Sequence, residues 1–491
     1  MKKHSSLLLT LFVLLSPLGA LAQGAPQAFS LQQSIDYALQ NRLSLKMARN
    51  QQDIDKAKVG EIRAMGLPQI NGNAEVGNNF IQQKTLFDPS SFGGAPSELD
   101  PFVITPEQVA SGQPIVLNPT YSQPEPQPST GLQAISFVQP YNGSLTITGS
   151  QLLFDGSYLI GLKAAKTYTE LSRKTTEQNE IDVVEQVTKA YYSVLVSRER
   201  MELLNQNLNR LDTLLKQTQV MFDNGVAEKL DVDRLRVTYN NLKVEKQKTE
   251  RLLILGEDLL KFQMGMPQRE QITLTDSLSE VQVDMAKTNR NGFNYSNRIE
   301  YSVLETQRDL AMLNLRNIRS GYLPKLYLNA RYGYIGVGST FSDVMNIRAG
   351  QDNTTDRNYF DFGYVGLQLQ LPIFDGLRKH YQVQQSRLTL ENAKLGFESL
   401  EQGIDLELEQ ASTDLTNSLD VLASQRENLE LAEEIARVSK IKFQEGVGSN
   451  LEVVTAETDL RQAQTNYYAA MYDALIAKVN LDKATGTLLT K

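Results

Sequence analysis

The residue types that most enzyme and metal sites need are almost missing from this 491-residue chain. It contains no cysteine and two histidines, His4 and His380. Zinc sites, copper sites and nucleophile–base pairs rely on these side chains, so the sequence offers no such constellation. Carboxylates are abundant, but they lie in helical sequence where solvated faces carry them. We therefore expect no catalytic residue, no metal site and no cofactor. A hydrolase using carboxylate pairs remains an alternative, without a pocket signature to support it.

Two similar motifs contain the residues most suited to a functional role. They are Phe222-x-x-Gly225-Val226 and Phe443-x-x-Gly446-Val447. Glycine after a helical run is typical of a helix C-cap, so the phenylalanines can be plain packing anchors. An acidic residue follows each motif, Asp231 in one case and Glu452 in the other.

An internal repeat explains why the motif occurs twice. Asn41-Arg42-Leu43 recurs as Asn297-Arg298-Ile299 at an offset of 256 residues, and Phe154-Asp155-Gly156 recurs as Phe374-Asp375-Gly376 at 220. The fall from 256 to 220 places 36 extra residues in the first half. Each half is expected to run helix, strand, loop, strand, long helix, turn, long helix. The expected repeats are residues 23–264 and 293–491, with a connector at 265–292.

Long helices should hold the two motifs. The sequence predicts helices from Gly156 to Phe222 and from Gly376 to Phe443, each of about 67 residues and roughly 100 Å long. Apolar residues seven apart supply the seam for a partner helix. One heptad series is Leu408, Leu415, Leu422, Leu429, Ala436 and Phe443, and a second is Ala456, Ala463, Ala470, Ala477 and Ala484. A solitary coiled-coil rod, such as a secreted adhesin, would show the same heptads but not the strands.

Four segments alternate apolar and polar residues with the period of a strand. They are Ile70–Gly77, Leu145–Thr148, Leu326–Tyr334 and Val365–Ile373. A soluble half-buried sheet and a membrane strand share this pattern. Between the first two segments, residues 80–136 hold nine of the sixteen prolines, so we expect an irregular, dispensable extracellular loop.

The N-terminus favours the membrane interpretation. Lys2 and Lys3, an apolar run and Ala20-Leu21-Ala22 are typical of a signal peptide at residues 1–22. Two lysines and no acid leave with it, so the net charge changes from −8 to −10, which argues against nucleic acid as a partner. No other stretch reaches the ~18 apolar residues of a membrane helix. Membrane barrels need about 8 strands or more, so four per chain predict an oligomer; three chains would supply twelve.

The sequence resembles the TolC family of outer-membrane efflux proteins over nearly all its mature length. The resemblance is carried by Leu369-Gln370-Leu371-Pro372-Ile373-Phe374-Asp375-Gly376, by Phe443-x-x-Gly446 with Leu451-Glu452-Val453, and by Gly486-Thr487-Leu488. It implies a homotrimer in the outer membrane of a Gram-negative bacterium, in contact with outer-membrane lipid and not lipid-anchored. In that family a twelve-stranded transmembrane β-barrel stands on a periplasmic α-helical barrel. A periplasmic adaptor and an inner-membrane pump dock at the helix tips.

The resemblance also suggests a gate at these tips, with changes. Asp231 matches the family's aspartate, but Phe443 replaces its tyrosine and Gly448 its arginine. The family's ring of paired acids becomes Glu452 and Thr455. Three copies of Glu452 would still form an acidic ring that favours cations and disfavours anions. We therefore expect closure to rest on packing by Leu230, Phe222 and Phe443. The turn residues expected to meet an adaptor are Phe222, Gly225, Val226, Gly446 and Val447.

The predicted function is the exit duct of a tripartite efflux or export system. A passive porin is the alternative, although a porin has no need of periplasmic helices about 100 Å long. The substrate is not encoded in a recognisable pocket.

Overall fold

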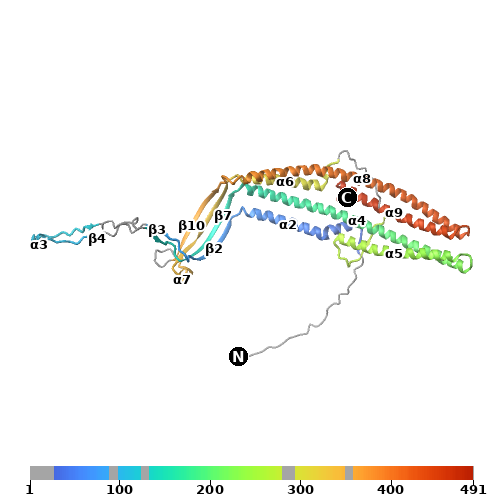
Figure 1. Cartoon of the computed structure of the whole chain (residues 1–491), viewed down its shortest axis with the longest axis horizontal. Helices are drawn as coiled ribbons and strands as arrows, with labels where there is room; N and C mark the ends of the chain where they lie inside the picture. The colour runs from blue at the N-terminus through green and yellow to red at the C-terminus, as the bar shows by residue number, and fades with distance from the viewer. Residues whose placement is uncertain (1–26, 88–97, 123–131, 279–292, 349–357, 490–491) are drawn as a thin grey trace, which may run out of the picture. The chain divides into compact units, whose positions relative to one another are not determined.

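The computed structural model describes residues 27–87, 98–122, 132–278, 293–348 and 358–489. The signal peptide expected at residues 1–22 and much of the expected connector lie outside the described residues. The chain divides into two compact units. One consists of Met1–Ile62, Leu159–Ser320 and Asp375–Lys491, and the other of Arg63–Tyr158 and Gly321–Phe374. Helices dominate the first unit and strands the second (Figure 1).

Four long helices make up most of the first unit (Figure 1). They are α4 (Gly156–Asp223), α5 (Lys229–Met264), α8 (Arg378–Gln444) and α9 (Asn450–Ala484). Shorter helices precede the strands of each half: α1 (Leu31–Asn41), α2 (Leu43–Ala64) and α6 (Ile299–Ser320), the last preceded by a 3-10 turn at Tyr295–Asn297. The helices α4 and α8 contain 68 and 67 residues, about 100 Å each. Both predicted long helices are confirmed.

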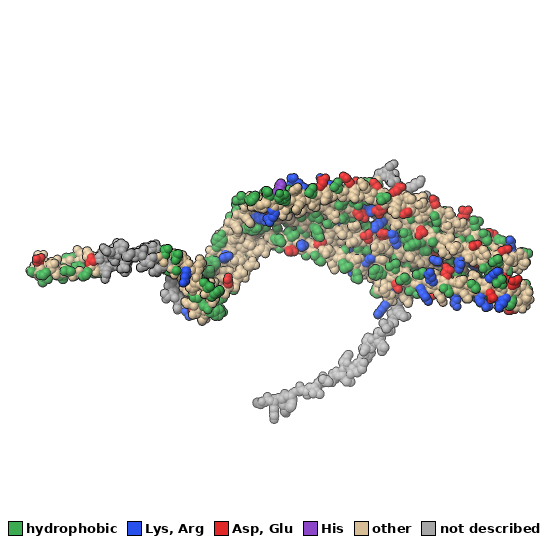
Figure 2. All heavy atoms as spheres, in the orientation of Figure 1, with side chains coloured by type: hydrophobic (Ala, Val, Ile, Leu, Met, Phe, Trp, Pro, Cys, Tyr) green, Lys and Arg blue, Asp and Glu red, His purple; other side chains and the backbone are tan. Residues whose placement is uncertain are grey.

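The predicted seam packs α8 against α9. Leu408 and Leu415 of α8 are buried with Ala477 and Ala484 of α9. Nearer the turn, Ala436 packs with alanines of α9 in a second cluster. Alanine at every seventh position lets the two backbones approach closely, which keeps the pair together along its length. Charged side chains are dense over the long helices and sparse over the strands (Figure 2).

In each half of the chain, one arginine joins the start of that half to the end of its second long helix. Arg42 donates from Nη1 to the carbonyl oxygen of Gln263, near the end of α5, at 2.9 Å. Arg298 donates in the same way to Ala484, the last residue of α9, also at 2.9 Å. Helix ends leave carbonyl groups without intrahelical partners, and the guanidinium supplies the missing donor. Sequence comparison had marked both arginines only as repeated residues.

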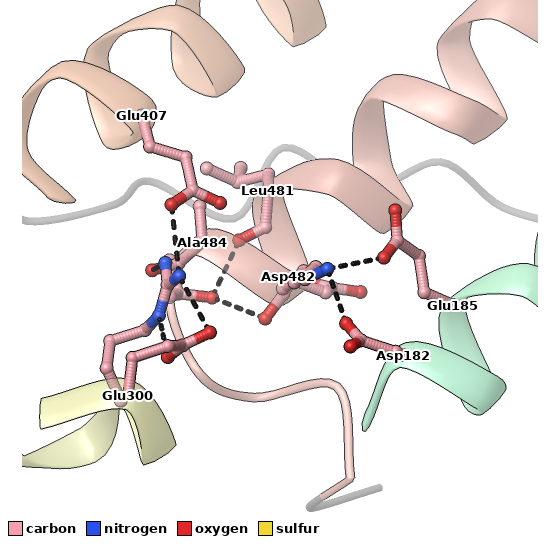
Figure 3. A network of polar contacts seen from close by, with 10 residues as sticks. Asp182, Glu185, Glu300, Glu407, Leu481, Asp482 and Ala484 are labelled. Atoms are coloured by element: carbon pink, nitrogen blue, oxygen red, sulfur yellow. Dashed lines mark hydrogen bonds and ion pairs between the residues drawn. The ribbon is translucent and has the colours of Figure 1, made fainter. Parts of the chain in front are cut away.

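Acidic side chains surround the second arginine and a nearby lysine. The Arg298 guanidinium is buried and lies 3.0 Å from Glu300 and 3.0 Å from Glu407. Lys483 contacts Asp182 at 2.9 Å and Glu185 at 2.6 Å. Figure 3 shows Glu300 and Glu407 on one side of the end of α9, and Asp182 and Glu185 of α4 on the other. Ion pairs thus connect α4, α6, α8 and α9 at this level.

A small parallel pairing and an apolar core lie at the same level of the helical unit. Strand β1 (Gln27–Phe29) pairs with β8 (Ile272–Leu274). Phe29 and Leu274 belong to a core cluster with Tyr191 of α4, whose hydroxyl donates to the Phe29 carbonyl at 3.2 Å. This contact ties the beginning of the described chain to α4. Among the helices that the structure describes, none is both long and apolar enough to cross a bilayer.

The second unit is built on one antiparallel sheet in the order β10-β9-β7-β2. Its strands are β2 (Gln69–Asn78), β7 (Tyr141–Phe154), β9 (Lys325–Gly338) and β10 (Tyr359–Gln370). Residues directly opposite each other point to the same face. Pairing therefore collects Ile147, Tyr332 and Val365 with other apolar residues on one face, and Asn71, Thr148 and Arg331 on the other. The four predicted strands are confirmed, with one apolar and one polar face.

The segment at residues 80–136 is not the wholly irregular loop that its prolines suggested. Strand β3 (Thr85–Phe87) pairs with β6 (Gln133–Ile135), and β4 (Glu98–Leu99) pairs with β5 (Tyr121–Ser122). Both ladders bracket the short helix α3 (Pro106–Ala110). None of these four short strands contains a proline, so the prolines of the segment do not interrupt their hydrogen bonds. A second short helix, α7 (Phe341–Met345), lies in the β9–β10 connection.

The boundary between β10 and α8 also differs from the prediction. The strand ends at Gln370 rather than Ile373, because Pro372 has no N–H to donate to a ladder. The helix begins at Arg378 rather than Gly376, since Gly376 and Leu377 both have positive φ, 68° and 64°. In the first half, α4 begins directly at Gly156, where the Asp155 carboxylate accepts from the Ser157 N–H at 2.7 Å.

Candidate functional site

Each pair of long helices is joined by a short turn built on the predicted glycine. After α4, Gly225 has a φ of 76° and its N–H donates to the Phe222 carbonyl at 2.9 Å. The Val226 N–H donates to Met221 at 2.8 Å. A residue with a Cβ resists this left-handed conformation, so glycine ends the helix here. The turn places the Val226 side chain in solvent, 72% exposed.

The second turn, after α8, repeats this geometry. Gly446 has a φ of 76° and donates to the Phe443 carbonyl at 3.2 Å. Val447 and Gly448 both donate to the Lys442 carbonyl at 3.0 Å. A Cβ at Gly448 would lie 2.9 Å from the Lys442 Cβ, so this turn has little room for a side chain at that position. Val447 is 80% exposed.

The two candidate acids lie in the first turns of the helices that follow. Asp231 is in the first turn of α5, 3.9 Å from Arg234. Glu452 is in the first turn of α9, and its N–H donates to the hydroxyl of the cap residue Ser449 at 3.2 Å. Carboxylates are favourable at a helix N-terminus because they face its partial positive charge. The structure thus places both acids at corresponding positions beside the turns, with Glu452 and Thr455 exposed.

An apolar cluster beneath the turns includes one of the three predicted packing residues. Phe443 packs partly buried against leucines of α4 and α5 and against Val453 of α9. A hollow of about 450 Å³ lies beside it, lined by Lys216, Gln217, Val220, Met221, Phe443 and Gln444. Phe222 and Leu230 remain exposed in the single chain, at 37% and 51%. Within one chain, therefore, Phe443 contributes to the cluster and the other two face outward.

A polar layer above this cluster had no counterpart in the sequence predictions. Asn207 of α4 and Gln464 of α9 are both buried, and the Asn207 Nδ2 donates to the Gln464 Oε1 at 2.8 Å. Arg210 donates to the Asn207 Oδ1 and lies 3.4 Å from Glu457 of α9. The signal was available: Asn207 occupies a seam position between Leu204 and Leu211. Buried polar residues in such seams fix helix partners and register.

Among the described residues, no group of three or more histidine, aspartate or glutamate side chains is arranged to hold a metal ion. The candidate site consists of two turns, the acids Asp231 and Glu452, and an apolar cluster at the end of four helices. Turns and exposed side chains at the ends of long helices suit a closure or docking surface.

The chain is similar to known proteins, to some in sequence and to others in fold. Outer membrane protein TolC of Vibrio cholerae is 21% identical over 354 residues, 70% of this chain and 77% of that protein. Outer membrane protein TolC of Escherichia coli is 20% identical over 362 residues, 73% of this chain and 72% of that protein. The crystal structure of the outer membrane protein VceC from Vibrio cholerae shares the fold, with a TM-score of 0.63 and 15% identity over 93% of this chain and 96% of that one.

The matched regions include both turns and most of the long helices. The family model described as outer membrane efflux protein matches residues 131–251 and 296–487, which is more than half of the chain. The resemblance noted from the sequence is thereby confirmed. This protein belongs to the family of outer membrane efflux proteins.

Proposed function

We propose that three copies of this outer-membrane efflux channel close one twelve-stranded barrel, which continues into a periplasmic barrel of helices. The observation that carries the proposal is the sheet itself. Its outer strands, β2 and β10, have one unpaired edge each within the four-stranded sheet. Open edges in lipid leave backbone groups without partners, so the edge of β2 must meet the β10 edge of a second copy. Strands of 10 to 14 residues are long enough to cross an outer membrane.

The two faces of the sheet fit this arrangement. In a membrane barrel, apolar residues face the lipid and polar residues face the lumen. The apolar face of this sheet would then contact outer-membrane lipid, and the polar face would line the duct. Helices about 100 Å long would carry the duct across the periplasm. A passive porin does not need them, and the family is one of efflux proteins rather than porins. Two relatives are named outer membrane protein TolC and toluene efflux pump outer membrane protein TtgC, which favours transport over an enzymatic role.

The proposed assembly includes a periplasmic adaptor and an inner-membrane pump, which supply substrate to the duct. The helix-tip turns support this role, because Val226 and Val447 offer exposed apolar side chains at the ends of the long helices. We assign residues 23–264 and 293–491 to two duplicated units joined by a connector at 265–292. The matching hydrogen bonds of Arg42 and Arg298 support the duplication.

Closure at the tips is the proposed gate. Threefold symmetry would bring Asp231 and Glu452 of three chains toward one axis, with Phe443, Phe222 and Leu230 packing nearby. Gly448 and Phe443 lack the groups of the family's latch, so apolar packing replaces it. The polar layer at Asn207 and Gln464 would help to hold α4 against α9 above the gate.

Purification from outer membranes tests the proposal. The protein in detergent should have the mass of three chains, separate on heating, and form cation-selective channels in planar bilayers. A monomer that forms no channel would overturn the trimer and the duct together. A trimer with wide, ungated conductance would support the porin alternative instead.

A further inference from the structure

The polar face of the sheet holds a guanidinium that no described residue engages. Arg331 lies near the middle of β9, directly opposite Thr148 of β7 and Tyr364 of β10. Asn71 of β2, opposite Thr148, completes the row. These four side chains point to the same face because directly opposed residues do so in antiparallel ladders. Within the described part of the chain, the Arg331 side chain is exposed and makes no hydrogen bond or ion pair.

The other charges of this face do not neutralise Arg331. Lys325, at the start of β9, is already paired with Asp155 at 2.8 Å. Glu75 is the one carboxylate among the paired residues on the polar face of the described sheet. It lies four residues along β2 from Asn71 and two strands away from Arg331, a separation of about 16 Å at ordinary strand spacings. Exposed charges that far apart are screened at physiological salt. A local positive potential therefore remains.

Arg331 is one of the residues that line a hollow on the sheet. The volume of this hollow is about 530 Å³, and all four strands contribute to its lining. Phe362 and Tyr364 of β10 line one side. The Tyr364 ring lies over Gly366, where an added Cβ would collide with its hydroxyl, so the glycine makes room for the ring. Asn329 donates to the Gln368 side-chain oxygen at 2.9 Å, which orders the amides beside the rings. Small-molecule sites typically have volumes of about 300–1,000 Å³.

We propose that this hollow is a transit subsite for organic anions that carry a planar aromatic ring. The guanidinium fork of Arg331 would bind a carboxylate or sulfonate through paired hydrogen bonds. Phe362 and Tyr364 would contact the ring, since aromatic side chains pack against flat π-systems. The inference rests on the proposed trimeric barrel, in which this face lines the lumen and three copies of Arg331 form a ring. Anionic aromatic compounds are then a substrate class that the outer-membrane end of the duct favours.

Block of single channels in planar bilayers tests the subsite. Naphthalene sulfonate, added to the chamber facing the barrel, should reduce conductance reversibly in the wild-type trimer. Arg331→Gln should raise the dissociation constant for this block about tenfold, because one charge-assisted contact is lost. Lys84→Gln removes the same charge from a residue outside the sheet, and should leave the block unchanged. Arg331→Lys, which keeps the charge and loses the fork, should fall between wild type and Arg331→Gln.

A second probe separates the two parts of the subsite. Methanesulfonate has the anion and no ring, so Tyr364→Leu should weaken block by naphthalene sulfonate without changing block by methanesulfonate. If a conducting trimer forms and Arg331→Gln and Lys84→Gln alter the block equally, the subsite is refuted while the channel stands. If the wild-type protein forms no channel at all, the proposed function fails first. If Arg331→Gln does not assemble, Arg331→Lys provides the test. Equal dissociation constants for block by naphthalene sulfonate in wild type and Arg331→Lys would refute the paired hydrogen bonds.

Discussion

The Nη1 of Arg298 lies 2.9 Å from the carbonyl oxygen of Ala484, the residue at which α9 ends. Two residues beyond it, Gly486 has a φ of 75°, and a Cβ there would lie 2.6 Å from the Asn297 carbonyl oxygen. The beginning of the second half thus closes on its own last helix. Arg42 and Gly265 make the corresponding contacts in the first half. The difference lies in the surroundings, because Arg298 has two carboxylate partners and Arg42 has glutamines.

This difference predicts unequal losses of stability. Arg298→Ala should lower the free energy of unfolding by about 3 kcal/mol, because it leaves Glu300 partly buried without its cation. Arg42→Ala should cost about 1–2 kcal/mol, since its partners are neutral. Urea unfolding of detergent-solubilised protein at one fixed concentration measures both. Arg298→Lys is the matched control and should lose less than Arg298→Ala. Equal losses for Arg42→Ala and Arg298→Ala would contradict the assigned role of the ion pairs.

The loss of folding stability at low pH should depend on Glu185 and Glu300. Burial alone would raise the pKa of Glu185, but hydrogen bonds from Lys189 and Lys483 outweigh it and hold this pKa below the ordinary 4.5. For Glu300, burial is likewise outweighed by Arg298, which lowers the pKa. A lowered pKa contributes stability that is present above the unfolded value and lost as pH falls through the folded one. The unfolding temperature should therefore drop below about pH 4.5. Glu185→Gln should make the unfolding temperature fall less steeply with decreasing pH. An unchanged slope would show that Glu185 does not contribute to the loss of stability.

The proposed gate makes two separate electrical predictions. Glu452→Gln should weaken cation selectivity and block by divalent ions, because carboxylates near one axis attract cations. Phe443→Ala should raise the resting conductance, since it removes the aromatic side chain that packs against the cluster beneath the turns. Thr455→Ala, one helical turn from Glu452, is the control for selectivity. If selectivity and divalent block survive Glu452→Gln, the constriction lies elsewhere.

The polar layer predicts a coupling between α4 and α9. Gln464→Leu should destabilise the protein by about 1–3 kcal/mol, because it leaves the buried Asn207 amide without its acceptor. Combining it with Asn207→Leu should recover part of that loss, since no orphaned amide remains. Arg210 then keeps Glu457 as its partner. A double-mutant cycle from urea unfolding gives the interaction energy. Simple additivity of the two substitutions would show that the 2.8 Å contact is not energetically coupled.

Long helices were the most predictable part of this fold. Their bounds follow from local signals, namely Phe154-Asp155-Gly156 at one end and the glycine turn after Phe222 at the other. Strand alternation gave the faces of the sheet correctly. The exact ends of helices and strands were harder to predict. The left-handed conformation of Leu377 and the strand pairing beyond Asn78 depend on neighbouring residues in space, which a single sequence does not reveal. The hairpin ladders within residues 80–136 were hidden by proline content.

The positions of the two helix-tip turns were predictable because the signal for a turn is local. The turns at Gly225 and Gly446 needed only the preference of glycine for positive φ. The contacts of Arg42 and Arg298 span 221 and 186 residues, so the sequence identified the residues as repeated without showing their partners. The sequence shows Arg331 as a polar residue in an alternating strand. That no other charge lies near it can be known only from the register of all four strands.

Closure of the barrel by three chains is the central claim, and the absence of cysteine permits a direct measurement. We would place one cysteine on the polar face of β2, as Asn71→Cys, and scan β10 with Tyr364→Cys, Gly366→Cys and Gln368→Cys in turn. A disulfide needs Cβ atoms about 4 Å apart, so only a strand pair in register will oxidise. We predict that one pair of cysteines yields a covalent ring of three chains in outer membranes, without cross-linked species of more than three chains. Uncrosslinked chains in every combination, with a monomeric mass in detergent, would contradict it.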